Sequence, residues 1–143
     1  MLPGILFSLL AGMFITILSV FNANASEKIG LWQTNTIVHG LGLVVSLIIF
    51  MMVRDGTWKD VQETNKLYLV GGALGVVIVF SVMKGIVILG PAYSVSILLI
   101  AQLLLAVVVN TFGWFGVEPV SFSFSKMAGI MMMIGGILVF QLK

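Results

Sequence analysis

Residues 2–22 read LPGILFSLLAGMFITILSVFN, an apolar stretch long enough to cross a bilayer, for which about 20 residues suffice. Small or polar residues recur in it every three or four positions: Gly4, Ser8, Gly12, Thr16, Ser19 and Asn22. At about 100° per residue they share one sector of about 120° around a helix, and large apolar side chains lie opposite. A membrane helix with such a face contacts something other than lipid there. We expect either another helix or a path for a solute.

The composition indicates an integral membrane protein. The 143 residues are 60% hydrophobic and 8% charged, and the mean hydropathy is +1.22, whereas soluble domains carry about 25% charged residues. A net charge of +2 is too small to predict nucleic-acid binding. The absence of cysteine excludes disulfides and thiolate metal sites.

The hydropathy pattern predicts an all-α protein with five transmembrane helices in a single transmembrane domain, residues 1–143. The helices cover about residues 2–22, 33–53, 67–88, 91–111 and 126–142. Residues 23–31 are expected to form a short polar turn, and Gly90-Pro91 ends one helix and begins the next. We expect Ser125 to cap the last helix.

A signal-peptidase site is suggested by Ala23-Asn24-Ala25 before Ser26. However, no Lys or Arg precedes the apolar core, and the core exceeds the usual length of about 7–15 residues. We therefore expect residues 2–22 to stay in the protein as a helix.

Loop charge is nearly balanced between the two membrane surfaces. Five spans place the termini on opposite sides, with Arg54, Lys59, Lys66 and Lys126 on the N-terminal side and Lys28, Lys84 and Lys143 on the other. The positive-inside rule thus favours a cytoplasmic N-terminus by one charge. Both a fixed orientation and insertion in both orientations remain open.

No Asp or Glu lies inside any predicted span. A charge at the bilayer centre is costly and usually functional, and a membrane carboxylate is a common means of exchanging protons for cations. This sequence lacks such a carboxylate at depth.

The second span carries a polar stripe. Asn35, His39, Gly42 and Ser46 are spaced 4, 3 and 4 residues apart, which is one helix face. The stripe is typical of a cavity wall, in which His39 could titrate or donate a hydrogen bond to a solute. Alternatively, His39 only bonds a neighbouring helix, a contact commonly worth about 1 kcal/mol.

Two further polar residues lie within spans. Lys84 is close enough to a helix end to extend to the interface, or it forms a charged mouth that attracts anionic solutes. Gln102, in the middle of the fourth span, either bonds within the bundle or belongs to the solute site. Four glycines are predicted to permit close helix packing, within one chain or in a dimer: Gly71, Gly75, Gly129 and Gly136.

Motifs of soluble enzymes are missing from the sequence. It has no glycine-rich phosphate loop, no His/Glu metal pair and no nucleophile elbow. We expect a protein that is not an enzyme and that needs no cofactor or metal.

The order of motifs is similar to that of a known family. These motifs are Gly71-Gly72-Ala73-Leu74-Gly75, Leu89-Gly90-Pro91-Ala92, Ala101-Gln102-Leu103, Asn110-Thr111-Phe112-Gly113-Trp114-Phe115-Gly116 and Lys126-Met127-Ala128-Gly129. The chain resembles the small five-helix branch of the drug/metabolite transporter superfamily, described as inner-membrane exporters of unknown function. The resemblance covers nearly the whole chain.

The resemblance implies a half-sized transporter, since ten-helix relatives consist of two inverted five-helix repeats. The chain would then pair antiparallel with itself or with a paralogue in a bacterial-type inner membrane. Helices one to four of each half would surround the site, and the fifth would be peripheral. Two residues depart from the family pattern: Asn110 stands where Asp is common, and Lys84 stands where an apolar or amide residue is usual.

The sequence therefore predicts a subunit of a small-molecule exporter that works by alternating access. Its solute path would be lined by Ser8, Gly12, Thr16, Ser19, Asn35, His39, Ser46 and Gln102. Without an acid at depth, we expect a neutral, zwitterionic or anionic metabolite. The competing hypothesis is an accessory membrane protein, whose small faces only hold a partner.

Overall fold

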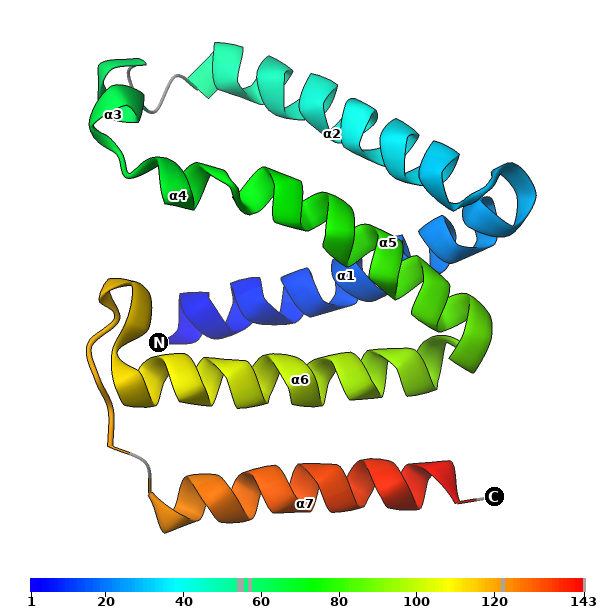
Figure 1. Ribbon diagram of the computed structural model, residues 1–143, viewed down its shortest axis with the longest axis vertical. Helices are drawn as coiled ribbons and strands as arrows, with labels where there is room; N and C mark the ends of the chain where they lie inside the picture. The colour runs from blue at the N-terminus through cyan, green and yellow to red at the C-terminus, as the bar shows by residue number, and fades with distance from the viewer. Residues whose placement is uncertain (54–55, 57, 122, 143) are drawn as a thin grey trace. The chain divides into compact units, whose positions relative to one another are not determined.

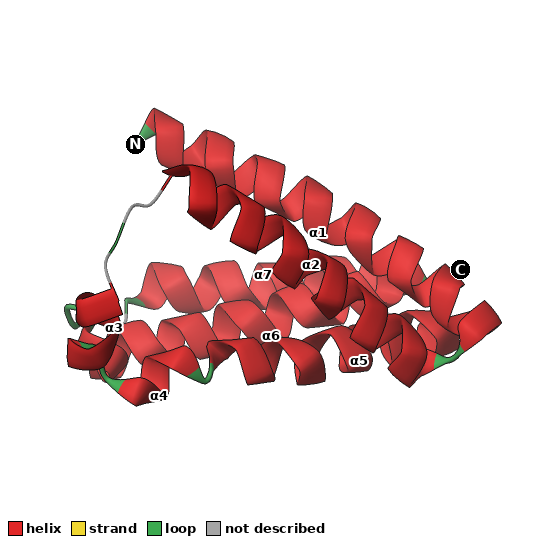
Figure 2. Ribbon diagram, turned by 90° about the horizontal axis from the view of Figure 1, so that it is seen from above, coloured by secondary structure: helices red, strands yellow, loops and turns green. Residues whose placement is uncertain are grey.

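The computed structural model describes residues 1–53, 56, 58–121 and 123–142. The described residues form helices and no strand (Figures 1 and 2). In chain order these are α1 (Leu2–Ile29), α2 (Leu31–Val53), α3 (Trp58–Glu63), α4 (Lys66–Leu69), α5 (Gly71–Leu89), α6 (Pro91–Phe112), the 3-10 helix η1 (Trp114–Gly116) and α7 (Phe124–Gln141).

Within the described residues, four helical stretches are long and apolar enough to cross a membrane: Leu2–Ile29, Leu31–Val53, Lys66–Leu89 and Pro91–Phe112. A shorter apolar helix covers Phe124–Phe140. The prediction of an all-α membrane fold is confirmed. Arg54, Asp55 and Lys143 lie outside the described residues, as do the side chains of Trp58 and Lys59.

The first helix is longer than predicted, and the polar turn expected at 23–31 is wrong. α1 continues to Ile29, because a polar side chain need not end a helix when it bonds its own backbone. The Ser26 hydroxyl donates to the Ala23 carbonyl at 2.7 Å. The chain turns only at Gly30, whose φ of +93° is open to glycine and rarely adopted by other residues.

The cap of the last helix is also corrected. Ser123 rather than Ser125 is the N-cap of α7, and its hydroxyl accepts from the Lys126 N–H at 3.4 Å. The third predicted helix is interrupted at Val70, between α4 and α5. Its start is fixed by Asn65, whose side chain accepts from the Leu67 N–H at 3.0 Å.

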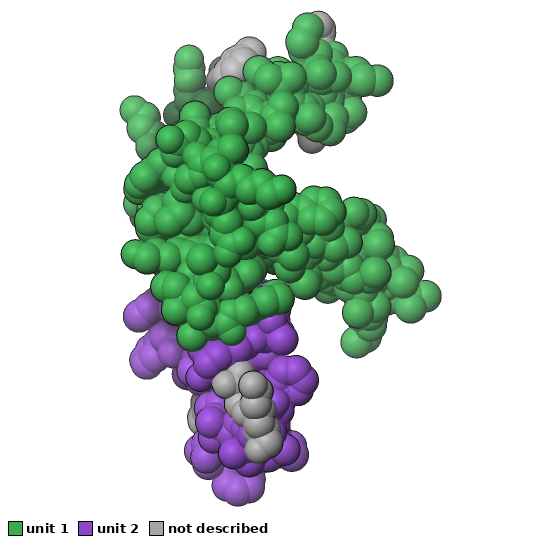
Figure 3. Space-filling view, turned by 90° about the vertical axis from the view of Figure 1, so that its right-hand side faces the viewer, with its two compact units in different colours: residues 1–91 green, residues 92–143 purple. Residues whose placement is uncertain are grey.

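The chain divides into two compact units, residues 1–91 and 92–143 (Figure 3). In the first unit α1, α2 and α5 pack against one another. Their buried residues come from three short segments: 19–26 of α1, 34–35 of α2 and 83–86 of α5. Residues 1–18 and 40–53 are exposed throughout. The helices thus meet near the α1–α2 turn, and Figure 2 shows α1 and α2 separating from α5 toward the end that carries the N-terminus.

The second unit contains α6, η1 and α7. After α6 the chain reverses at Gly113, which has a φ of +65°. The N–H of Val120 then donates to the Asn110 carbonyl at 2.8 Å, which holds the returning segment against the end of α6. The Asn110 carbonyl, one of the last in α6, thus has its partner outside the helix.

Candidate solute site

The junction of α1, α2 and α5 buries polar side chains. Among the described residues, the buried polar set is Ser19, Asn22, Ser26, Thr34 and Asn35. The buried apolar set is smaller, with Ala23, Met83 and Ile86. Polar groups within membrane spans commonly bond between helices or mark solute paths. This junction is the candidate site.

The hydroxyl groups of the junction donate to their own helices. Ser19 donates to the Ile15 carbonyl at 2.6 Å, and Thr34 donates to the Gly30 carbonyl at 2.9 Å. Ser26 does the same toward Ala23. A hydroxyl that has used its one proton keeps acceptor lone pairs. These oxygens can therefore accept further hydrogen bonds without breaking those within the helices.

Asn35 links two helices. Its Nδ2 donates to the Val76 carbonyl of α5 at 2.8 Å, and the residue is 1% exposed. The other amide atom, Oδ1, is buried and accepts no hydrogen bond from the described part of the chain. Buried polar atoms are normally paired, so this oxygen is an exception that requires an explanation.

His39 lies one turn further along the same face of α2. Its Nδ1 is 2.9 Å from the Asn35 carbonyl oxygen. A carbonyl can only accept, so Nδ1 carries a proton, and in the neutral ring Nε2 then has a lone pair. Nε2 lies beside Gly75 of α5, where an added Cβ would be 3.5 Å away.

An aromatic pair closes the same seam toward the α1–α2 turn. The rings of Trp32 and Phe80 are stacked, with centroids 4.6 Å apart and an angle of 23° between planes. Trp32, Asn35 and His39 are three and four residues apart, so one face of α2 contacts α5 over two turns. Trp32 thus packs on α5 through its ring.

The structure brings only some of the predicted path residues together. Ser19 and Asn35 are buried at the junction, and His39 is half-buried beside them. The remaining predicted residues on α1 and α2 are exposed: Ser8, Gly12, Thr16 and Ser46. Thr16 donates to the Gly12 carbonyl at 3.0 Å, and Ser46 donates to the Leu43 carbonyl at 2.9 Å. These two hydroxyls therefore bond within their own helices.

Lys84 is exposed on α5, and Gln102 is exposed on α6 in the second unit. Of the predicted packing glycines, Gly75 lies against His39. A Cβ at the other three would meet no atom of the described chain within 4 Å: Gly71, Gly129 and Gly136. Their role in packing stays a prediction.

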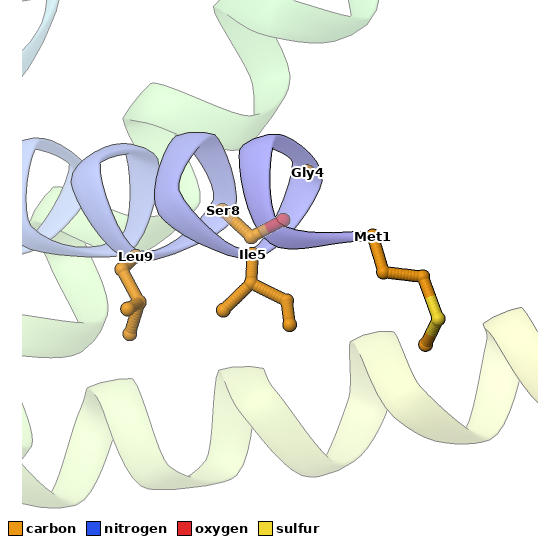
Figure 4. Close-up of a pocket in the computed structure, with 5 residues that line it drawn as sticks. All are labelled: Met1, Gly4, Ile5, Ser8 and Leu9. Atoms are coloured by element: carbon orange, nitrogen blue, oxygen red, sulfur yellow. The ribbon is translucent and has the colours of Figure 1, made fainter.

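A hollow of about 470 Å³ lies on the first turns of α1, apart from the junction. It is lined by Met1, Gly4, Ile5, Ser8 and Leu9 (Figure 4). These side chains are mostly apolar and come from one helix, so no polar groups converge on it. Within the described residues, no group of three His, Cys, Asp or Glu could hold a metal ion.

A family model described as "Putative inner membrane exporter, YdcZ" matches residues 3–139. The chain belongs to this family. Neither a curated protein nor a solved structure gives a match. Membership in the YdcZ family confirms the resemblance drawn from the sequence, and with the long apolar helices it identifies a multi-pass inner-membrane protein of an exporter family.

In this YdcZ-family chain, sequence reasoning missed two buried polar residues of the junction, Ser26 and Thr34, and the stacking of Trp32 against α5. Ser26 follows Ser19 and Asn22 at the same three-and-four spacing, so a longer first helix would have included it. Thr34 precedes the polar stripe by one position. The stacking of Trp32 on Phe80 depends on how α2 and α5 pack, for which one sequence carries no signal.

Proposed function

We propose that this YdcZ-family chain is a subunit of a small-molecule exporter that works by alternating access. It pairs antiparallel with itself or with a paralogous five-helix subunit, and its two units belong to one transmembrane domain. In such transporters two inverted halves move around a site near the membrane midplane. The chain acts by hydrogen bonding and close backbone approach, not by covalent catalysis.

One observation carries the proposal: the polar faces of α1 and α2 are buried at one end and open at the other. On α1, Ser19 is buried while Ser8 and Thr16 are exposed. On α2, Asn35 is buried while Ser46 is exposed. A polar path closed toward one surface and open toward the other is what one state of an alternating-access transporter requires.

The closed end is held by two α2–α5 contacts, the Trp32–Phe80 stack and the Asn35–Val76 hydrogen bond. In the proposed cycle these contacts separate when the path opens to the other side. The predicted spans contain no acid, so the substrate is a neutral, zwitterionic or anionic metabolite. Lys84, exposed on α5, attracts an anionic group in this scheme.

Thiol accessibility tests the function, because the chain has no cysteine of its own. Single cysteines replace Thr16, His39 and Ser46 and are probed with membrane-impermeant thiol reagents in oriented vesicles. If the chain transports a solute, water reaches all three positions, so each cysteine should react with the reagent. The side of the membrane from which position 39 reacts should change between conditions. Leu41→Cys, at an exposed apolar position of α2, is the control that faces lipid and stays unreactive.

A locked gate gives the second measurement. A short, reducible bifunctional thiol reagent that joins Trp32→Cys to Phe80→Cys should stop flux, and reduction should restore it. Protection of positions 16, 39 and 46 from both sides in every condition would instead identify an accessory protein.

A further inference from the structure

We propose that Asn35 Oδ1 and His39 Nε2 form an acceptor-only recognition site on the α2–α5 seam. The site takes an uncharged group that donates hydrogen bonds, either a hydroxyl or an amide N–H. This inference rests on the proposed transport function, because it names the chemistry of the solute that the path selects.

The orientation of the Asn35 amide provides the first acceptor. The Val76 carbonyl can only accept, so the Nδ2 group must face it, and Oδ1 must point elsewhere. The residue is 1% exposed, and Oδ1 has no partner within the described chain. A buried acceptor without a partner is energetically unfavourable, so a donor that reaches Oδ1 removes this penalty.

The tautomer of His39 provides the second acceptor independently. Nδ1 donates to the Asn35 carbonyl, so in the neutral ring the lone pair is on Nε2. His39 is one helical turn from Asn35, so both acceptors lie on the same face of α2. Gly75 places no side chain against Nε2, and a Cβ added there would lie 3.5 Å from it.

The surrounding charge decides the class of ligand group. α2 and α5 contain no acidic residue, and Glu27 of α1 is exposed, so no carboxylate balances a bound cation. An anionic group placed against Asn35 Oδ1 and His39 Nε2 would meet lone pairs that repel it, so a negative charge elsewhere on the solute would be placed toward Lys84 instead. An uncharged donor forms hydrogen bonds with these atoms, and it neither needs a balancing carboxylate nor is repelled by their lone pairs.

The single histidine of the chain makes the site directly observable. Selective ¹⁵N-histidine labelling of the protein in nanodiscs, with an affinity tag that lacks histidine, gives ring signals from His39 alone. The Nε2 resonance reports acceptance of a hydrogen bond. The probes are acetamide and ethylene glycol, each compared with its methylated counterpart, N,N-dimethylacetamide or 1,2-dimethoxyethane, which has no donor.

We expect a saturable Nε2 shift with acetamide, ethylene glycol or both, and none with the methylated compounds. Comparison of the two donors separates an amide-bearing from a hydroxyl-bearing solute. Gly75→Ala places a methyl group beside Nε2 and should weaken binding about tenfold, roughly the value of one hydrogen bond. Gly72→Ala, also on α5 and with no atom within 4 Å of the added Cβ, is the matched control and should bind normally. Asn35→Ala should also weaken binding.

Three results would overturn the inference. They are no saturable shift with either donor, equal shifts with the methylated probes, or a resonance that is already at its hydrogen-bonded position in buffer and does not move, which means that water alone fills the site. If any of these occurs while thiol accessibility still alternates, the recognition site fails and the transport function stands. If the donors bind but thiol accessibility does not alternate, the recognition site stands and the transport function fails.

Discussion

At the scale of single residues, Asn35 has two distinct roles in one amide group. Its nitrogen joins α2 to α5 through the Val76 carbonyl, and its oxygen stays available in the junction. A hydrophobic residue at this position could supply neither the hydrogen bond to α5 nor the acceptor oxygen. The stability of the seam and the recognition of a solute are therefore coupled through one side chain.

Asn35→Ala should destabilise the protein because it removes the bond to Val76. Hydrogen bonds between membrane helices average about 0.6 kcal/mol and reach about 1.7 kcal/mol, and we expect a loss in this range. Unfolding in mixed micelles, followed by tryptophan fluorescence, measures it. Thr36→Ala is the control, since the Thr36 hydroxyl bonds only the Trp32 carbonyl of its own helix. Equal effects of both variants would contradict the role of Asn35.

Gly30 sets the turn that brings α1 against α2. Its φ of +93° and ψ of 152° lie in a region that is essentially restricted to glycine. Gly30→Ala should therefore cost about 1–3 kcal/mol in unfolding free energy. Gly40→Ala, within α2 and with no atom within 4 Å of an added Cβ, should be neutral or slightly stabilising. If Gly30→Ala leaves the unfolding free energy unchanged, the turn must have another conformation at this residue.

At the scale of elements, α2 and α5 form the seam that the proposed gate requires. The contact combines a stacked aromatic pair, a hydrogen bond from a side chain to a carbonyl, and a histidine against a glycine. The three contacts follow one another along one face of α2. A motion that separates the helices would break them together.

A double-mutant cycle tests the aromatic part of the seam. Trp32→Leu, Phe80→Leu and the double variant should show a coupling of about 0.5–1.5 kcal/mol, as expected for an aromatic pair beyond its buried area. Phe7, exposed near the start of α1 in the same unit, gives a control pair with Trp32 that should be additive. Coupling near zero for Trp32 and Phe80 would rule out the stack as a gate.

At the scale of the whole molecule, near-balanced loop charge permits insertion in both orientations. Gln62→Lys adds a positive charge to the N-terminal side and should fix that side in the cytoplasm, whereas Glu27→Lys should favour the reverse. Labelling of a cysteine at position 63 from each side of the membrane reports the orientation.

If an antiparallel pair transports, each biased variant alone should lose flux and coexpression of the two should restore it. Flux from either variant alone, with its orientation fixed, would exclude the antiparallel pair. A wild-type chain labelled from one side only would point to a paralogous partner in the opposite orientation.

The fold class was predictable because long apolar runs can only be helices in a bilayer, where each backbone group must be satisfied within its own segment. The start of α6 at Pro91 and the polar stripe on α2 followed from the same local rules. The end of α1 was missed at Asn22, because polar residues at 22–26 were interpreted as a turn although Ser26 bonds its own helix.

Sequence alone thus determined that the chain crosses the membrane as helices with small polar faces and no acid at depth, since these properties are local. Only the tertiary structure decided which part of each face is buried. Their spacing along the sequence placed Ser8, Thr16 and Ser19 on one helix face, but of these three only Ser19 is buried at the junction. Helices that cross near one end bury only that end. The crossing point depends on contacts between segments far apart in the chain, such as Asn35 with Val76.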